Sequence, residues 1–184
     1  MFLEPEYWFL QYALCEITND IENRNFLIEN ITEKVMRKYS NEADIFLKSE
    51  FAFIDFLMAL HLQITSEEQV QIYENAVDIV NNEAIDDEKT VTYKDEMITN
   101  PFKVFSTFLY KTNEKEFNEL LYDAIEGFKY YDENYDENES PEFWQPILLI
   151  SAAASMIYNK NYNILFTSDY LPMWLIEKSI EVAK

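Results

Sequence analysis

Hydrophobic residues recur along most of this chain at three- and four-residue intervals, the spacing that places them on one face of a helix. The segments with this spacing are separated by short polar turns rich in Asn, Asp and Ser. The pattern predicts an all-α fold, a single-domain bundle of about seven or eight helices over residues 1–184. The predicted helices cover residues 5–20, 26–39, 41–64, 66–80, 100–109, 113–128, 140–158 and 172–180.

Capping residues and prolines mark several of the predicted helix starts. Ser66 and the acidic and amide residues that follow it are typical of a capping box. Asn100 before Pro101 has the favoured order of a cap followed by a proline in the first turn. Asn113 with Glu116 indicates a further start. These features support separate helices rather than a few long ones.

Two acidic segments, near residues 85–97 and 130–140, depart from the helical pattern, and we expect both to be loops. Within the first, residues 90–93 alternate in the sense of a strand, but so short a segment makes only a marginal one. The second segment reads YYDENYDENES and contains a tandem Tyr-Asp-Glu-Asn repeat.

Composition narrows the class of protein. The chain is 48% apolar and contains 13 Tyr, 14 Phe and 3 Trp, which excludes a disordered acidic tail. Gly127 is the one glycine, where a chain of this length usually has roughly a dozen. Phosphate-binding loops and dinucleotide-binding turns need glycine, so we expect neither kind of loop in this chain. The scarcity of glycine favours a helical fold further.

Cysteine usage and the first residues indicate the compartment. With Cys15 as its single cysteine, the chain cannot form an intramolecular disulfide, and an unpaired thiol suits a reducing cytoplasm. Glu4 and Glu6 stand where a signal peptide would have basic residues. The apolar run from Pro146 is too short to span a bilayer. We therefore expect a soluble cytoplasmic protein.

The net charge of −21 is the strongest indication of a partner. Residues 65–140 contain twenty acidic and six basic side chains, which is −14, whereas residues 141–184 contain four acidic and three basic ones, which is −1. Such a charge repels nucleic acid and anionic lipid and attracts basic proteins. We expect a basic protein partner, with no nucleic acid and no membrane; the oligomeric state stays open.

Acidic residues gather in two predicted binding patches, and in the one near residues 130–140 they alternate with tyrosines. Carboxylates steer a basic partner, and tyrosine is a frequent anchor residue in interfaces. A solvated acidic loop is the alternative interpretation of the second patch. The predicted partner-binding residues are Asp86, Asp87, Glu88, Asp95, Glu96, Tyr131, Asp132, Glu133, Tyr135, Asp136, Glu137 and Glu139.

Candidate catalytic and metal-binding residues are few. His61, the single histidine, lies in an apolar segment and is expected to be a core or boundary residue, as is Cys15. The Tyr-Asp-Glu-Asn repeat has the spacing of a calcium loop but lacks its glycine and its final glutamate. We therefore expect a non-catalytic protein with no metal and no cofactor. An enzyme that uses paired carboxylates in a helical bundle is an alternative.

Residues 140–179 read SPEFWQPILLISAAASMIYNKNYNILFTSDYLPMWLIEKS. An alanine-rich helix, a polar turn at Asn159–Asn161 and an extended stretch ending in Tyr-Leu-Pro before a final helix resemble the C-terminal part of bacterial polymorphic-toxin immunity proteins. The resemblance is to the immunity protein 49 family and, more loosely, to immunity proteins of PoNe-type DNase toxins. Asn161 stands where that pattern favours glycine, and asparagine also tolerates left-handed geometry.

The resemblance implies a helical, cytoplasmic, non-catalytic protein that occludes a cognate toxin, and it assigns no functional residue. Because many such toxins act on nucleic acid, the implied target is basic, which agrees with the charge of this chain. A phage-encoded DNA mimic or anti-defence inhibitor would have the same acidic character and is a further alternative.

Overall fold

The computed structural model describes residues 4–39, 46–110, 112–135 and 145–177. These residues form helices and loops without a strand, so the predicted all-α fold is confirmed. In chain order the elements are α1 (Pro5–Thr18), α2 (Ile21–Asn30), α3 (Glu33–Tyr39), α4 (Lys48–Ala59), α5 (Ser66–Asn82), α6 (Glu88–Tyr93), the π-helix η1 (Lys94–Thr99), α7 (Asn100–Ser106), α8 (Glu114–Tyr135), α9 (Gln145–Tyr158) and α10 (Met173–Ile176).

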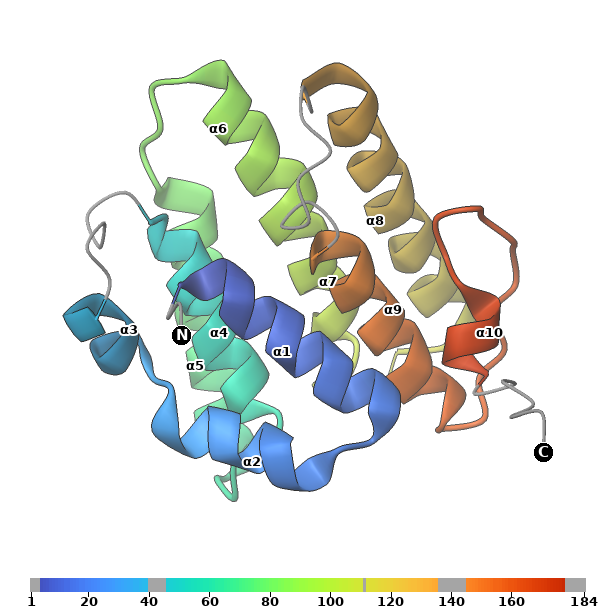
Figure 1. Ribbon diagram of the computed structural model, residues 1–184, viewed down its shortest axis with the longest axis horizontal. Coiled ribbons are helices and arrows are strands. Elements are labelled where there is room, and N and C mark those ends of the chain that lie inside the picture. The colour runs from blue at the N-terminus through green and yellow to red at the C-terminus, as the bar shows by residue number, and fades with distance from the viewer. Residues whose placement is uncertain (1–3, 40–45, 111, 136–144, 178–184) are drawn as a thin grey trace.

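Aromatic side chains join the helices into one core. Helix α1 packs against α9, α4 against α5, and α7 against α8 (Figure 1). The fully buried ring of Phe53 on α4 has its centroid 5.3 Å from that of Phe9 on α1. The same ring lies 5.5 Å from Phe102 and 5.9 Å from Phe105 on α7. Burial of each such ring stabilises the fold by on the order of 2–3 kcal/mol, so the aromatic content is used mainly in the core.

The segment predicted as an acidic loop near residues 85–97 is largely helical, so that prediction was wrong. Only residues 83–87 form the connection, and the marginal strand expected at residues 90–93 lies within α6. Asp87 starts the helix, because its carboxylate accepts hydrogen bonds from the backbone N–H groups of Lys89 at 3.1 Å and Thr90 at 3.0 Å. An aspartate cap therefore outweighs the β-like alternation of the four residues that follow.

Helices α6, η1 and α7 run on without a break, although a new helix start was predicted at Asn100–Pro101. The backbone N–H of Asn100 bonds to the carbonyl of Asp95, five residues back, and Asn100 has helical dihedral angles. A proline inside an α-helix clashes with the carbonyl four residues before it, and a wider π-type turn relieves that crowding. Pro101 is thus accommodated by η1 rather than by a helix boundary.

Two other boundaries differ from the prediction for local reasons. The predicted helix 26–39 is divided into α2 and α3, and α2 begins earlier because Asp20 accepts a hydrogen bond from the Asn23 backbone at 3.1 Å. The capping box of α5 is formed by Thr65, not Ser66: its hydroxyl accepts from the Glu68 N–H at 3.2 Å, and the Glu68 carboxylate accepts from the Thr65 N–H at 2.8 Å. Part of the predicted helix 41–64 lies outside the described residues, and α4 itself spans a shorter range.

The C-terminal quarter has the predicted order of elements. After α9, Asn161 adopts a left-handed φ of 66°, as its residue type allows. Residues 162–170 then run without helix along α8: the Asn118 side chain bonds to the carbonyl of Asn163 at 3.0 Å and to the N–H of Leu165 at 2.7 Å. Leu171 is buried, and α10 follows Pro172. Helix α10 ends at Ile176, before the predicted end at residue 180, and residues 178–180 lie outside the described residues.

Candidate functional site

The described parts of the two predicted acidic patches lie at the same end of the molecule, where α6 begins and α8 ends (Figure 1). The ring of Tyr93 on α6 contacts that of Tyr131 on α8, with centroids 5.9 Å apart. The pKa of the Tyr130 phenol is raised, first by Tyr135 and further by the carboxylates of Glu88 and Glu96. Carboxylates from the first patch therefore act on a side chain of the second. We call this region the acidic end; it comprises residues 86–88 and 130–135.

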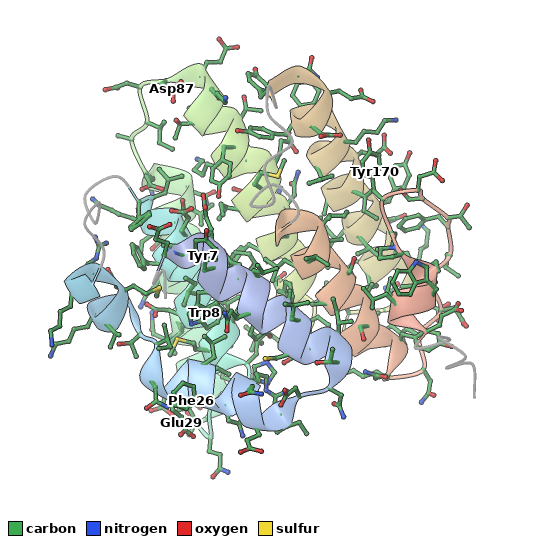
Figure 2. All side chains as sticks on the ribbon, in the orientation of Figure 1. Tyr7, Trp8, Phe26, Glu29, Asp87 and Tyr170 are labelled. Atoms are coloured by element: carbon green, nitrogen blue, oxygen red, sulfur yellow. The ribbon has the colours of Figure 1, made fainter. Side chains whose placement is uncertain are left out.

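At the start of α6 the predicted residues face solvent. Asp86, Asp87 and Glu88 are all exposed, and Figure 2 shows Asp87 at the extremity of the molecule. The hydrogen bonds that Asp87 accepts from Thr90 hold the pKa of its carboxyl below the usual value, so it stays ionised. These three carboxylates form the outer part of the acidic end.

Asp95 and Glu96 lie further along the helix and face different surroundings. Asp95 is exposed and has a carboxylate oxygen 3.4 Å from Nζ of Lys94. Glu96 is half-buried against α8, where it accepts a hydrogen bond from Nδ2 of Asn100 at 2.6 Å. Its carboxylate lies where a Cβ on Gly127 would stand, so the chain's single glycine permits this close approach. Burial raises the pKa of Glu96, with Asp95 adding to the effect.

On α8 the predicted residues divide between surface and interior. Tyr131 is buried and stacks on Tyr135 with ring centroids 5.4 Å apart. Asp132 is half-buried and accepts a hydrogen bond at 3.2 Å from the hydroxyl of Tyr170, which Figure 2 shows on the C-terminal segment. Glu133 is exposed. The first half of the second predicted loop is thus helix, because α8 continues to Tyr135.

The predicted residues Asp136, Glu137 and Glu139 lie outside the described residues. The exposed aromatic side chain of this end is Tyr130, which is 49% exposed. The tyrosines predicted as anchor residues were Tyr131 and Tyr135, but Tyr131 is buried in the core and Tyr135 is half-buried, so neither offers the exposed ring that was predicted.

A cavity of about 350 Å³ opens beside the acidic end. Its wall brings together Glu6 of α1, Leu47 and Glu50 at the start of α4, Lys89 and Tyr93 of α6, and Tyr131 of α8. Four separate parts of the chain therefore form it. Its volume falls within the range of about 300–1,000 Å³ that small-molecule sites usually have.

Glu50 is the group with the most unusual electrostatics in this cavity. Its side chain is only 4% exposed; Oε2 accepts from the Leu47 N–H at 2.9 Å and Oε1 accepts from the Tyr93 hydroxyl at 3.2 Å. Burial raises the pKa of Glu50 to about 7, and the carboxylates of Glu6 and Glu83 add to the rise against these two hydrogen bonds. Near neutral pH this carboxyl group therefore exists in both its protonated and ionised forms.

Glu83 approaches the same helix start from the loop before α6. Its carboxylate accepts hydrogen bonds from the backbone N–H groups of Lys48 at 2.6 Å and Ser49 at 3.1 Å. Together Glu50 and Glu83 satisfy three of the N–H groups at the start of α4. The positive end of the helix dipole favours both carboxylates there.

Neither Glu50 nor Tyr93 was predicted to belong to a site. The one local signal is that Glu50 directly precedes the apolar run Phe-Ala-Phe-Ile at residues 51–54, which is an unusual place for a charged side chain. Its partner Tyr93 is 43 residues away in the chain, in a segment predicted to be a loop. The cavity could therefore be found only in three dimensions.

A second buried polar cluster lies between α1, α2 and the turn after α4. Oε1 of Glu16 lies 3.0 Å from Nη1 of Arg24 and 3.3 Å from Nε2 of His61. The hydroxyl of Tyr12 lies 2.8 Å from the same His61 nitrogen. Burial, with the charge of Arg24, lowers the pKa of His61 to about 4, so the ring is neutral near pH 7. His61 is thus the boundary residue that its sequence position indicates.

Cys15 lies beside this cluster without the properties of a nucleophile. Burial raises the pKa of its thiol, and the carboxylates of Asp20 and Glu16 raise it further. A raised pKa disfavours the reactive thiolate. Among the described residues, no group of three His, Cys, Asp or Glu side chains is arranged to hold a metal ion.

A smaller groove of about 270 Å³ lies between α4 and α5 and is lined by Ala52, Met58, Ile72 and Ala76 with Asp55 beside them. It is largely apolar and carries a single carboxylate, so it lacks the concentration of charge found at the acidic end.

In the part of the chain that the structure describes, no helix is both long and apolar enough to cross a membrane. No protein-family model, curated protein or solved structure matches the chain.

Proposed function

We propose that this chain is a non-catalytic immunity protein of the cytoplasm that binds a basic bacterial toxin through its acidic end and occludes the toxin's active site. The observation that supports the proposal most directly is that the start of α6 and the end of α8, each with exposed carboxylates, lie at the same end of the molecule. One partner can contact carboxylates at the same end together. Carboxylates at opposite ends of the molecule would attract a partner to no single surface.

The charge of the chain determines the kind of partner that this surface would attract. At a net charge of −21, complementary potentials steer a basic protein toward the acidic end and repel nucleic acid. Charge alone contributes more to the rate of association than to affinity. The exposed ring of Tyr130 beside these carboxylates supplies apolar contact area of the kind that anchors interfaces.

The experiment uses the product of the gene next to this one as the candidate toxin. That product is expressed alone and together with this chain, and bacterial growth is measured. We expect arrest in the first case and rescue in the second. Asp86→Lys with Glu133→Lys should abolish rescue, because both exposed carboxylates lie at the acidic end and neither caps a helix.

The matched control is Glu29→Lys with Glu74→Lys, two exposed residues on α2 and α5. Figure 2 shows Glu29 at the end of the molecule opposite Asp87. Both double variants change the net charge by the same amount, so a difference between them reports on location. Loss of rescue in both variants, or in neither, would contradict the proposed surface. The rate constant for association of this chain with the toxin should be much lower at the higher of two salt concentrations, because salt screens the attraction between the charges.

The geometry of Glu50 favours one second candidate, an enzyme that uses a carboxyl group as general acid or base. A carboxyl with a pKa of about 7, in a cavity that Glu6 also lines, has the protonation behaviour that such catalysis needs. Stoichiometry separates the two functions. An occluding protein protects the cell only at equimolar amounts or above, whereas an enzyme that modifies the toxin acts at far lower ratios.

A further inference from the structure

We propose that the cavity beside Glu50 is a socket for an arginine side chain of the partner. This inference rests on the proposed function, because it names the side chain by which a basic partner would be held at the acidic end. The socket lies next to the exposed carboxylates of α6, since Lys89 and Tyr93 of that helix form part of its wall. A partner drawn to the acidic end would therefore lie close to the cavity.

Glu50 is buried without a positively charged side chain paired to it among the described residues. Both of its hydrogen-bond donors, the Leu47 backbone and the Tyr93 hydroxyl, are neutral. None of the ion pairs formed by the described residues includes Glu50. A buried carboxylate is normally paired with a positive charge, because its desolvation is otherwise uncompensated. An incoming cation would supply that charge.

The chain's own nearest candidate does not fill this role. Lys89 lines the cavity, but its side chain is exposed, and its charge contributes to lowering the pKa of Asp87 rather than that of Glu50. Lys89 therefore stands at the opening as a like charge to any cation that enters. Its removal should favour the ligand, whereas removal of the Glu50 charge should disfavour it.

The shape and chemistry of the wall favour guanidinium over other cations. A carboxylate has about four lone-pair sites, and one on each oxygen of Glu50 is occupied, so each oxygen retains capacity to accept a further hydrogen bond from a planar guanidinium. The rings of Tyr93 and Tyr131 form the adjoining wall, and guanidinium stacks on aromatic rings more readily than ammonium does. Lysine, with its strongly hydrated ammonium group, should bind less well.

Binding of a cation should be linked to release of a proton. The charged or titratable groups around Glu50 are Glu6 from α1, Glu83 from the loop before α6, Lys89 and Tyr93 from α6, and Tyr131 from α8. Glu6 and Glu83 both favour the protonated form of Glu50, whereas guanidinium favours the ionised form. If only the ionised form binds, affinity should fall about tenfold between pH 8 and pH 6, since the pKa of Glu50 is about 7.

The experiment titrates the full chain with N-acetyl-arginine amide, followed by NMR at the backbone N–H of Leu47. The neutral isostere N-acetyl-citrulline amide is the matched ligand control. We expect saturable binding of the arginine compound at pH 8, about tenfold weaker binding at pH 6, and none of the citrulline compound. Glu50→Gln should lose binding by at least tenfold, and Lys89→Ala should strengthen it.

The proposed arginine socket would be contradicted if the arginine and citrulline compounds bound equally well. It would also be contradicted if the arginine compound bound Glu50→Gln as strongly as the native chain. A Lys89→Ala variant that binds more weakly than the native chain would contradict it as well. The proposed function fails separately: it is contradicted when the Asp86→Lys, Glu133→Lys variant still neutralises the partner, whatever the arginine compound does. Conversely, a partner that depends on the acidic end but is indifferent to Glu50→Gln would retain the proposed function and exclude the socket.

Discussion

The buried carboxylates of Glu16 and Glu50 occupy similar depths in two regions of the molecule, with 8% and 4% of each residue exposed. Around Glu16 the chain supplies a cation, since Nη1 of Arg24 lies 3.0 Å from its Oε1. Around Glu50 it supplies only the neutral donors Leu47 N–H and Tyr93 hydroxyl, with further carboxylates nearby. The two regions therefore bury the same chemical group in opposite electrostatic surroundings.

This difference separates a structural role from a binding role. A buried carboxylate that is paired with a cation of the same chain has its charge compensated, and changing either member of the pair mainly affects stability. A buried carboxylate with a raised pKa and no cation costs stability whenever it is ionised. Groups of the second kind concentrate at functional sites, so the region around Glu50 is the better candidate for binding.

The largest loss of stability is expected when Arg24, the cation of the Glu16–Arg24 pair, is removed. Arg24→Ala leaves Glu16 buried without its cation and should reduce the free energy of unfolding by about 3 kcal/mol. Urea denaturation measures this. The control is Lys115→Ala, which removes an ion pair with Glu119 whose side chains are 81% and 62% exposed and should cost at most about 0.5 kcal/mol. Equal losses in the two variants would contradict the distinction between the regions.

The next effect concerns Glu50 and has the opposite sign. Its pKa is near 7 in the folded chain and 4.5 for an unperturbed group, so the folded state binds more protons between these values and the native chain loses stability as pH rises through this window. Glu50→Gln removes the ionisable group. Relative to the native chain, it should therefore gain about 2–3 kcal/mol between pH 4.5 and pH 8.

Urea denaturation of Glu50→Gln and the native chain across that pH range tests the prediction. A difference between the two proteins that does not change with pH would show that Glu50 ionises normally. The comparison cancels the contributions of other titrating groups, because both proteins contain them.

A smaller effect is expected at His61. Because burial and then Arg24 lower its pKa to about 4, the ring should show no titration between pH 5 and pH 8. Since folding depresses the pKa of this base, stability should be lost as pH falls below the ordinary value of 6.5. In Arg24→Ala the pKa of His61 should rise, because the nearby positive charge is removed, while burial of the ring continues to lower it. The NMR signal of the single histidine ring measures both values, and an unchanged pKa in the variant would exclude coupling to Arg24.

The smallest expected effect is on the folding of the acidic end. Asp86→Lys with Glu133→Lys should change the free energy of unfolding by no more than about 0.5 kcal/mol, because both side chains are exposed and form no ion pair in the described part of the chain. Thermal denaturation checks this. A large loss of stability would mean that this variant cannot be used to locate the partner surface.

Local patterns predicted the helices well where apolar residues recur at helical spacing and misplaced those whose ends depend on single side chains. Helices α1, α8 and α9 follow the hydrophobic spacing. The acidic segment near residues 85–97 was misjudged, because the Asp87 cap and the π-turn before Pro101 keep it helical despite its polar composition. The capping box of α5 was displaced by one residue for the same reason: neighbouring Thr65 and Ser66 are both suitable caps, and only geometry selects between them.

The sequence by itself determined the all-α fold and the strongly acidic middle of the chain, because helical periodicity and net charge are properties of neighbouring residues and of composition. The tertiary structure alone decided that α6 and α8 bring two acidic segments to one end. It also decided that Glu50 meets Tyr93 from 43 residues away, while Glu83 reaches the start of α4 from 35 residues away. Such contacts depend on how the helices pack, and packing brings together residues that are far apart in the sequence and cannot be paired from local patterns.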